Sequence, residues 1–425
     1  MSRGLWISLI AVVVVGGGVG FFLARRGSSP EALLAAEMDA AKKDGMALSA
    51  ADLERSVPDD QNAAPGYESA FQAIRPTVHD HPNLLTEINE ALKGTADAEA
   101  MKDIRAAVSE SRRDINSLIA ASRRKSCDFD YDFEGEFKFP ELADARVAAR
   151  LMIMSAHVAA DQGYVDEAYD VLSATEAMSR HIGETPLLIC YLVQISLDRY
   201  VAEEFVHVLN LSVHKPALLK KAQKTLDGFG PIAAITPALR AEAFVGLSNM
   251  NRCQTTGDVR AVTDPNQKGQ GAKLTDEQKV RLKLAAVSGL RRGLEATVAA
   301  GTDPRAQHDA LARLVAKQDD EAAKDHSPDH DLIAMIARDD LLPDAALAAG
   351  LQMADRHILA TAIKLMQAKG PYPSTLPNLG EISIDPMDGK PLRYRRTGSG
   401  FTLYSIGHNL KDDGGSPDDR AKTFK

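Results

Sequence analysis

Near its C-terminus the chain reads Asp385-Pro-Met-Asp-Gly-Lys-Pro-Leu-Arg-Tyr-Arg-Arg-Thr-Gly-Ser-Gly-Phe-Thr-Leu-Tyr-Ser405, and this stretch decides the fold of the C-terminal part. Apolar and polar residues alternate over residues 392–396 and again over 401–405, as they do in strands with one buried face. Gly398 and Gly400 lie between the two runs and favour a tight reversal of the chain. The stretch therefore predicts an antiparallel hairpin.

The residues before this hairpin predict a helix. Apolar side chains recur at spacings of three and four from Leu347 to Leu365, which places them on one helix face, and Gly370 ends the pattern. Because a two-stranded hairpin is at most marginally stable alone, we expect it to pack against this helix. Residues 344–425 are thus predicted to form a small C-terminal α+β unit with an antiparallel hairpin.

The order of these motifs resembles the C-terminal half of the major pseudopilin of type II secretion. The resemblance covers residues 354–415 and includes the helix, Gly370-Pro-Tyr-Pro373, Leu376-Pro-Asn-Leu379, the Asp-Pro turn at Asp385, and the loop ending in Asp412-Asp-Gly-Gly415. In that family a helix packs on a small antiparallel sheet, and the closing acidic loop binds calcium.

The resemblance implies a calcium site in this chain. Carboxylate and amide oxygens are the ligands that Ca²⁺ prefers. The alternative is an acidic tail that is only solvated. The candidate ligands that the resemblance implies are Asn409, Asp412, Asp413, Asp418 and Asp419.

The chain departs from that family at its other end. Pseudopilins begin with a processed Gly-Phe site and carry a glutamate five residues into the mature helix, and this chain has neither feature. About three hundred residues of helical pattern also precede the C-terminal unit. We therefore do not expect a pilus subunit. The whole layout is similar to that of uncharacterised bacterial membrane-anchored helical proteins.

The N-terminal segment predicts a membrane anchor. Residues 5–24 carry no charge, and about 20 such residues cross a bilayer as a helix. Arg3 precedes the run, Arg25 and Arg26 follow it, and Trp6 lies near one boundary. We expect residues 1–29 to form a single-pass transmembrane helix in contact with membrane lipid, with the body outside the cytoplasm. The alternative is a cleaved signal peptide, for which the run is long.

The middle of the chain predicts a multi-helix body built of helical hairpins, so that the fold class is mainly α. The body comprises residues 30–253 and 274–343, and Thr275 and Gln278 have the spacing of a capping box at the start of the second part. Residues 254–273 are rich in Gly, Thr, Asn, Asp and Gln and predict a flexible loop. Residues 128–139 alternate aromatic and charged side chains, which predicts a strand or hairpin.

Composition disfavours several kinds of function. The formal net charge of −9 offers no basic field for nucleic acid. Cys127, Cys190 and Cys253 lie far apart and show no CxxC spacing, which argues against a cysteine zinc site. The histidine groups at residues 79–81 and 325–331 lack the HExxH spacing of a metalloprotease. No nucleophile elbow or phosphate-binding glycine loop is present either, so we assign no catalytic or cofactor-binding residues.

These observations favour an interaction or scaffold protein with partners in the bacterial envelope. The process it serves and its oligomeric state stay undefined by the sequence. The alternative is an envelope-associated hydrolase with its site in a cleft of the helical body. A deep pocket lined by converging histidines and carboxylates would favour the enzyme, whereas an exposed apolar groove would favour a binding module.

Overall fold

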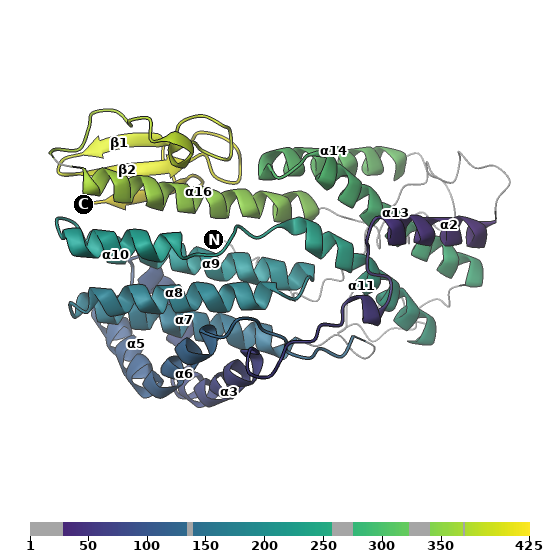
Figure 1. Cartoon of the computed structure of the whole chain (residues 1–425), viewed down its shortest axis with the longest axis horizontal. Coiled ribbons are helices and arrows are strands. Elements are labelled where there is room, and N and C mark those ends of the chain that lie inside the picture. Colours follow the sequence, from purple (N-terminus) through teal and green to yellow (C-terminus); the bar gives the residue numbers. More distant parts are fainter. Residues whose placement is uncertain (1–28, 134–138, 257–274, 323–340, 369) are drawn as a thin grey trace. The chain divides into compact units, whose positions relative to one another are not determined.

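The computed structural model describes residues 29–133, 139–256, 275–322, 341–368 and 370–425 (Figure 1). In these ranges the chain forms thirteen α-helices and one three-stranded antiparallel sheet. The chain divides into two compact units, each made of segments that are separate in sequence. Unit 1 comprises Met1–Glu54, Pro186–Ile189 and Ala234–Leu347, and unit 2 comprises Arg55–Thr185, Cys190–Ala233 and Ala348–Lys425.

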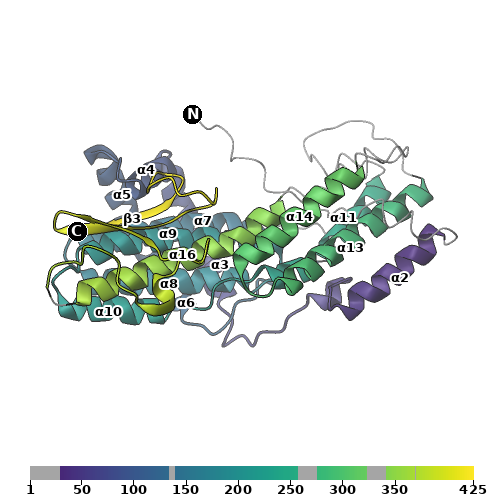
Figure 2. The same ribbon diagram turned by 90° about the horizontal axis from the view of Figure 1, so that it is seen from above.

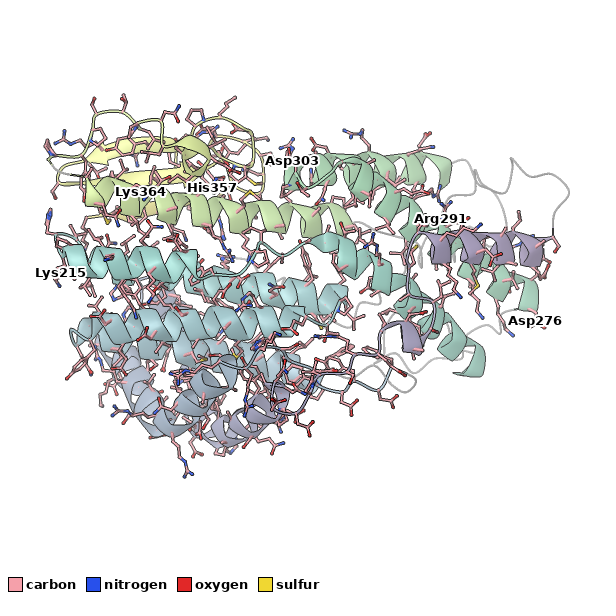
Figure 3. The ribbon with its side chains drawn as sticks, in the orientation of Figure 1. Lys215, Asp276, Arg291, Asp303, His357 and Lys364 are labelled. Carbon is pink, nitrogen blue, oxygen red and sulfur yellow. The ribbon has the colours of Figure 1, made fainter. Side chains whose placement is uncertain are left out.

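Unit 1 is organised around one long helix, α13 (Asp276–Ala299). The capping box predicted for it is confirmed, because Thr275 accepts from the backbone N–H of Gln278, and Gln278 accepts from that of Thr275. Figure 2 shows α13 between α2 (Pro30–Lys43) and α11 (Ile235–Thr256), and both helices contact it. Arg291 of α13 forms an ion pair with the buried Glu37 of α2 at 2.6 Å and is labelled in Figure 3. The other helices of this unit are α2 (Pro30–Lys43), α11 (Ile235–Thr256) and α14 (Pro304–Ala322).

Unit 2 contains the helical hairpins that the sequence predicted. In one hairpin, α7 (Pro140–Asp161) packs along α8 (Val165–Gly183), and Gly163 in the turn between them has a φ of +92°, which favours glycine. Most of α9 and α16 also belongs to this unit. Its helices are α3 (Ala64–Asp80), α4 (Leu84–Leu92), α5 (Ala98–Glu110), α6 (Arg112–Ser122), α7 (Pro140–Asp161), α8 (Val165–Gly183), α9 (Leu188–Asn210), α10 (Pro216–Asp227) and α16 (Leu341–Gln367).

The C-terminal sheet confirms the predicted hairpin and adds a third strand. The strands β1 (Arg393–Thr397) and β2 (Gly400–Ser405) pair antiparallel, and β3 (Arg420–Phe424) pairs with the other edge of β2. The rings of Phe401 and Phe424 are buried and stack with centroids 5.1 Å apart. The sheet lies along α16 in both views, as expected for a small sheet that needs a helix to cover its apolar face (Figures 1 and 2).

Two contacts fix the segment before the sheet to α16. The Nδ1 atom of His357 lies 2.7 Å from the carbonyl oxygen of Ile384, and the Thr361 hydroxyl donates to the carbonyl of Ile382 at 2.6 Å. Figure 3 labels His357 on this helix. These bonds give the backbone of the 3₁₀ turn Gly380–Ser383 and its neighbour Ile384 defined partners.

The predicted fold class, with its transmembrane helix, requires a correction. In the part of the chain that the structure describes, no helix is both long enough and apolar enough to span a membrane. The physical reason is visible in the two most apolar long helices, because α9 carries Asp198, Arg199 and Glu203 and α16 carries Asp355 and Arg356 within their central turns. The run at residues 5–24, which led to the prediction, lies outside the described residues.

A second correction concerns the aromatic stretch at residues 128–139. Its described residues, 128–133 and 139, contain no strand. Tyr131 instead contacts three neighbouring rings, with centroids 5.9 Å from Phe129, 6.0 Å from Phe133 and 4.9 Å from Phe139. Asp130 has a φ of +52°, which is incompatible with a regular strand. The predicted flexible loop lies outside the described residues except for 254–256, which end α11.

Candidate functional site

The acidic loop, residues 407–419, joins β2 to β3 and contains all five predicted calcium ligands. Asp419 is the one that lies inside the fold, with 5% of its surface exposed. Its Oδ2 atom accepts from the backbone N–H groups of Asp413 and Gly415 at 3.1 and 2.7 Å. Its Oδ1 atom is buried and has no hydrogen-bond partner. Asn409 is also tied into the loop, since its amide donates to Asp413 Oδ2 at 2.7 Å.

The other two predicted ligands, Asp412 and Asp418, have different surroundings. Asp412 is engaged outside the loop, where it accepts from Arg393 Nε at 3.1 Å and from the Tyr404 hydroxyl at 3.3 Å. The backbone N–H of Gly414 and the Arg393 guanidinium hold the pKa of Asp412 below its usual range. Asp418 is exposed at the surface of the loop. The structure therefore brings Asn409, Asp413 and Asp419 together and directs Asp412 toward the sheet.

A buried carboxylate supports the base of this loop. Asp385 is fully buried and accepts from the backbone N–H of Met387 at 2.9 Å, the Ser405 hydroxyl at 2.7 Å and the backbone N–H of Ile406 at 3.1 Å. Arg393 completes the set with an ion pair at 2.8 Å. Because Ile406 directly precedes the acidic loop, this network fixes the position at which the loop leaves the sheet.

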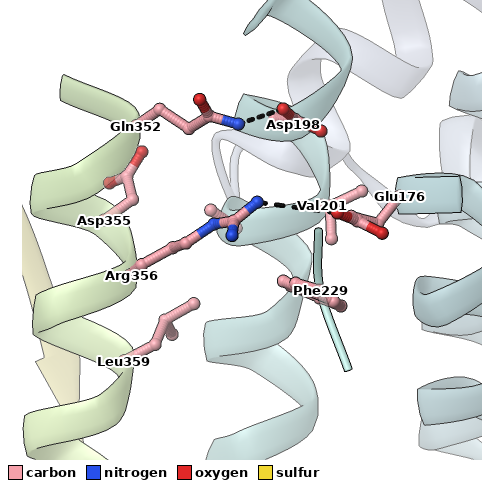
Figure 4. Close-up of a pocket in the computed structure, with 9 residues that line it drawn as sticks. Glu176, Asp198, Val201, Phe229, Gln352, Asp355, Arg356 and Leu359 are labelled. Carbon is pink, nitrogen blue, oxygen red and sulfur yellow. Dashed lines mark hydrogen bonds and ion pairs between the residues drawn. The ribbon is translucent and has the colours of Figure 1, made fainter. Parts of the chain in front are cut away.

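A second candidate is a small cavity within unit 2 (Figure 4). It has an empty volume of about 290 Å³ including its mouth. This volume includes open solvent, and the enclosed part has room for only about one or two water molecules. Its floor is charged, and in Figure 4 Arg356 of α16 points toward Glu176 of α8, 3.5 Å away. Gln352 donates to Asp198 of α9 across the cavity.

The charges in this cavity are unequally satisfied. Glu176 accepts from the backbone N–H of Gly230 at 2.7 Å and from Arg180 at 3.2 Å. By contrast, Asp198 Oδ1, Asp355 Oδ1 and Arg356 Nη2 are buried without hydrogen-bond partners. Burial, reinforced by the charge of Glu176, raises the pKa of Asp198 to about 7. A carboxyl with such a pKa can gain or lose a proton near neutrality, which is a property of acid–base groups.

Sequence reasoning missed this cavity. Its charged residues come from three helices that are far apart in the chain, and only the fold brings them together. A usable signal was present, because Asp198 interrupts an apolar helical run and a charge on a buried helix face requires a partner.

Of the two histidine groups, the structure describes residues 79–81, where His81 contacts two carboxylates. His81 follows the end of α3, and its ring nitrogens lie 2.7 Å from Asp103 and 3.1 Å from Glu110, both on α5. The hydrogen bond to Asp103 raises the pKa of His81, and the two contacts link the end of α3 to α5. The group at residues 325–331 lies outside the described residues.

Comparison with known proteins identifies no relative of this chain. No family model, no curated protein and no solved structure matches the chain. The resemblance to the major pseudopilin accordingly stays a prediction, and function has to be argued from the sites themselves.

Proposed function

We propose that this protein is an interaction or scaffold protein whose C-terminal unit is held in one conformation by a calcium ion in the acidic loop. The observation that supports calcium most directly is Asp419 Oδ1, a buried carboxylate oxygen without a hydrogen-bond partner. Burying a charged oxygen costs several kcal/mol unless a donor or a cation compensates it. A Ca²⁺ ion would compensate it and suits oxygen ligands.

The chemistry of the surrounding donors fits such an ion. Asp419 and Asp413 would hold it with two negative charges, and the Asn409 amide oxygen, which accepts from the backbone N–H of Lys411 at 3.0 Å, has a second lone pair to offer. Asp412 is excluded from this set because Arg393 and Tyr404 occupy its carboxylate. Bound calcium would fix the connection between β2 and β3, which gives the C-terminal unit a defined surface to present to a partner protein.

The cavity of unit 2 favours an interaction role over catalysis. Its enclosed part has room for about one or two water molecules and not for a substrate, and Glu176 and Arg356 already contact each other there. In the residues that the structure describes, the cavity lining contains no histidine. It therefore has converging carboxylates but not the histidines that we expected beside them in a hydrolase.

Calcium binding is tested by titration calorimetry and thermal melts of the intact chain. We expect binding by the wild type and a Tm that falls when EGTA is added. Asp419→Asn and Asp413→Asn should each weaken binding at least tenfold. Asp412→Asn should leave calcium affinity nearly unchanged, and Glu381→Gln, an exposed carboxylate outside the loop, is the charge-matched control. A wild type whose Tm and calorimetric signal do not respond to Ca²⁺ would eliminate the proposal.

The interaction role needs its own measurement. Cross-linking of the intact protein in native extracts, followed by mass spectrometry, should recover a reproducible set of partner proteins. We expect this set to be lost with Asp419→Asn or in EGTA and to be retained with Glu381→Gln. Identical partner sets for wild type and Asp419→Asn would show that calcium does not shape the binding surface.

One observation favours an enzyme as the second candidate. Asp198, with a pKa raised to about 7 by burial, lies in the cavity as a general acid or base would. This hypothesis predicts that the protein hydrolyses small ester or phosphoester substrates and that Asp198→Asn abolishes the activity while preserving the circular dichroism spectrum. Absence of turnover by the wild type across such a panel would leave the interaction role as the better account.

A further inference from the structure

Two neighbouring helices of unit 2 bring two histidines and two carboxylates together. On α7, His157 and Asp161 lie one turn apart, and on α9, Glu204 and His207 are three residues apart. These spacings place each pair on one face of its helix. Side chains of facing helices are a common source of metal ligands in helical bundles.

The four side chains contact one another closely. His157 Nδ1 lies 3.1 Å from Glu204 Oε2, and His207 Nε2 lies 3.0 Å from Asp161 Oδ1. The remaining His157 nitrogen is 3.6 Å from Asp161 Oδ2. The two imidazole rings stack with centroids 4.0 Å apart and planes inclined by 16°.

The distances are short enough for a single ion. One ligand atom from each of His157, Glu204 and His207 can be chosen so that all lie within 4.8 Å of one another. Ligand atoms at about 2.0–2.2 Å around a tetrahedral zinc ion are separated by about 3.4 Å. An ion would replace the ring stack, because each imidazole has to turn until one of its nitrogens points at a common position.

The charges of the group also fit a divalent cation. Glu204 is almost fully buried, with 3% of its side chain exposed, so its negative charge needs compensation. Protonating both histidines would place two positive rings in a stack, which is unfavourable. One divalent ion would neutralise both carboxylates and leave both imidazoles uncharged.

The geometry points to a transition-metal site: we propose that His157, Asp161, Glu204 and His207 bind a divalent ion of the zinc class. Two imidazole nitrogens and two carboxylate oxygens favour zinc and its neighbours in the first transition row over calcium or magnesium. Glu204 would form the buried floor of the site. Asp161 and His207, with 39% and 32% of their side chains exposed, leave one side open for the ion to enter.

Such an ion would join α7 to α9 within unit 2. The site is independent of the acidic loop, because it uses different residues and a different donor chemistry. It is also separate from the cavity around Asp198, because none of its ligands lines that cavity.

The test uses the intact chain, stripped with a chelator and kept in excess Ca²⁺ so that oxygen-donor sites are occupied. Zn²⁺ is then titrated in competition with a chromophoric chelator. We expect one tight site in the wild type and a loss of affinity on the order of 100-fold or more in His207→Gln and His157→Gln. His79→Gln, an exposed histidine on α3, is the matched control and should bind like the wild type.

Substitution with Co²⁺ separates ligation from a purely structural role of these side chains. Bound Co²⁺ with low coordination number and nitrogen ligands should give visible d–d absorption in the wild type and in His79→Gln, and not in His207→Gln. Circular dichroism verifies that each variant is folded. If the wild type binds Zn²⁺ no more tightly than a folded His207→Gln variant, or if its Co²⁺ spectrum is that of the free ion, the proposal is wrong.

Discussion

Single residues in the acidic loop have unequal structural roles, and its glycines demonstrate this. Gly407 and Gly414 both have positive φ values, of +68° and +72°, which side chains rarely adopt. They differ in their surroundings. A Cβ atom on Gly407 would overlap the carbonyl oxygen of Asp418, whereas a Cβ atom on Gly414 would meet nothing within 4 Å.

We therefore predict different costs for the same substitution. Gly414→Ala should lower the free energy of unfolding by about 1 kcal/mol, the usual cost of a left-handed backbone conformation. Gly407→Ala should cost about 2–4 kcal/mol, because strain from the overlap with the backbone is added. Urea unfolding of the two variants measures the difference. Equal costs would show that the backbone at Asp418 moves away freely from Gly407.

At the scale of elements, the sequence predicts those features that depend on residues close together in the chain. The hairpin β1–β2, the capping box of α13 and the α7–α8 hairpin all follow from residues close together in the chain. Strand β3 was missed because Arg420-Ala-Lys-Thr-Phe424 is short and only weakly alternating, and because its partner is separated from it by the acidic loop. Helices α5 and α6 are separate although no glycine or proline divides them, and the break falls at the buried Ser111.

The candidate sites differ in the same way, between groups that are local in sequence and groups that only the fold brings together. The five loop residues were found because they lie together in the sequence, but only the structure separates Asp412, bound by Arg393, from the buried Asp419. The pairs His157–Asp161 and Glu204–His207 have helical spacing that could be recognised in the sequence. Which helix faces which depends on tertiary packing, and no local pattern carries that information.

The contact between α16 and β3 provides a prediction at this scale. Asp355 of α16 is buried and forms an ion pair with Arg420 of β3, with Lys422 Nζ 4.0 Å from its other oxygen. Asp355→Asn should lower the free energy of unfolding by about 3–5 kcal/mol, because it leaves the half-buried guanidinium uncompensated.

A double variant isolates the interaction energy between Asp355 and Arg420. Asp355→Asn with Arg420→Gln should recover part of the loss, giving a coupling energy of about 1–3 kcal/mol in a double-mutant cycle measured by urea unfolding. Strictly additive effects would mean that Lys422, and not Arg420, compensates Asp355.

At the scale of the whole molecule, a buried carboxyl in each unit has a pKa raised almost to neutrality. Burial raises the pKa of Asp198 in unit 2 and of Glu242 in unit 1, in each case to about 7. Glu242 accepts from the backbone N–H of Leu188 at 2.7 Å, which only partly offsets the effect of burial. Both groups have pKa values of about 4 in an unfolded chain.

The sign of the pH dependence follows from these values. The folded chain binds these two protons more tightly than the unfolded chain, so their contribution to stability is complete below pH 4 and is lost as the pH rises through 7. Each group should thus lower the free energy of unfolding by a few kcal/mol between pH 4 and 8. Other carboxylates have the opposite trend, so the comparison has to be made between variants.

Asp198→Asn and Glu242→Gln remove the ionisation and keep the shape of each side chain. At pH 8 both variants should be more stable than the wild type, and the difference should shrink or change sign at pH 5. Because the two residues lie in different units, the effects should add in the double variant. Urea unfolding at pH 5 and pH 8 measures this. If wild type and variants change equally between the two pH values, then both carboxyls are already ionised in the folded protein and a cation must stabilise their charge.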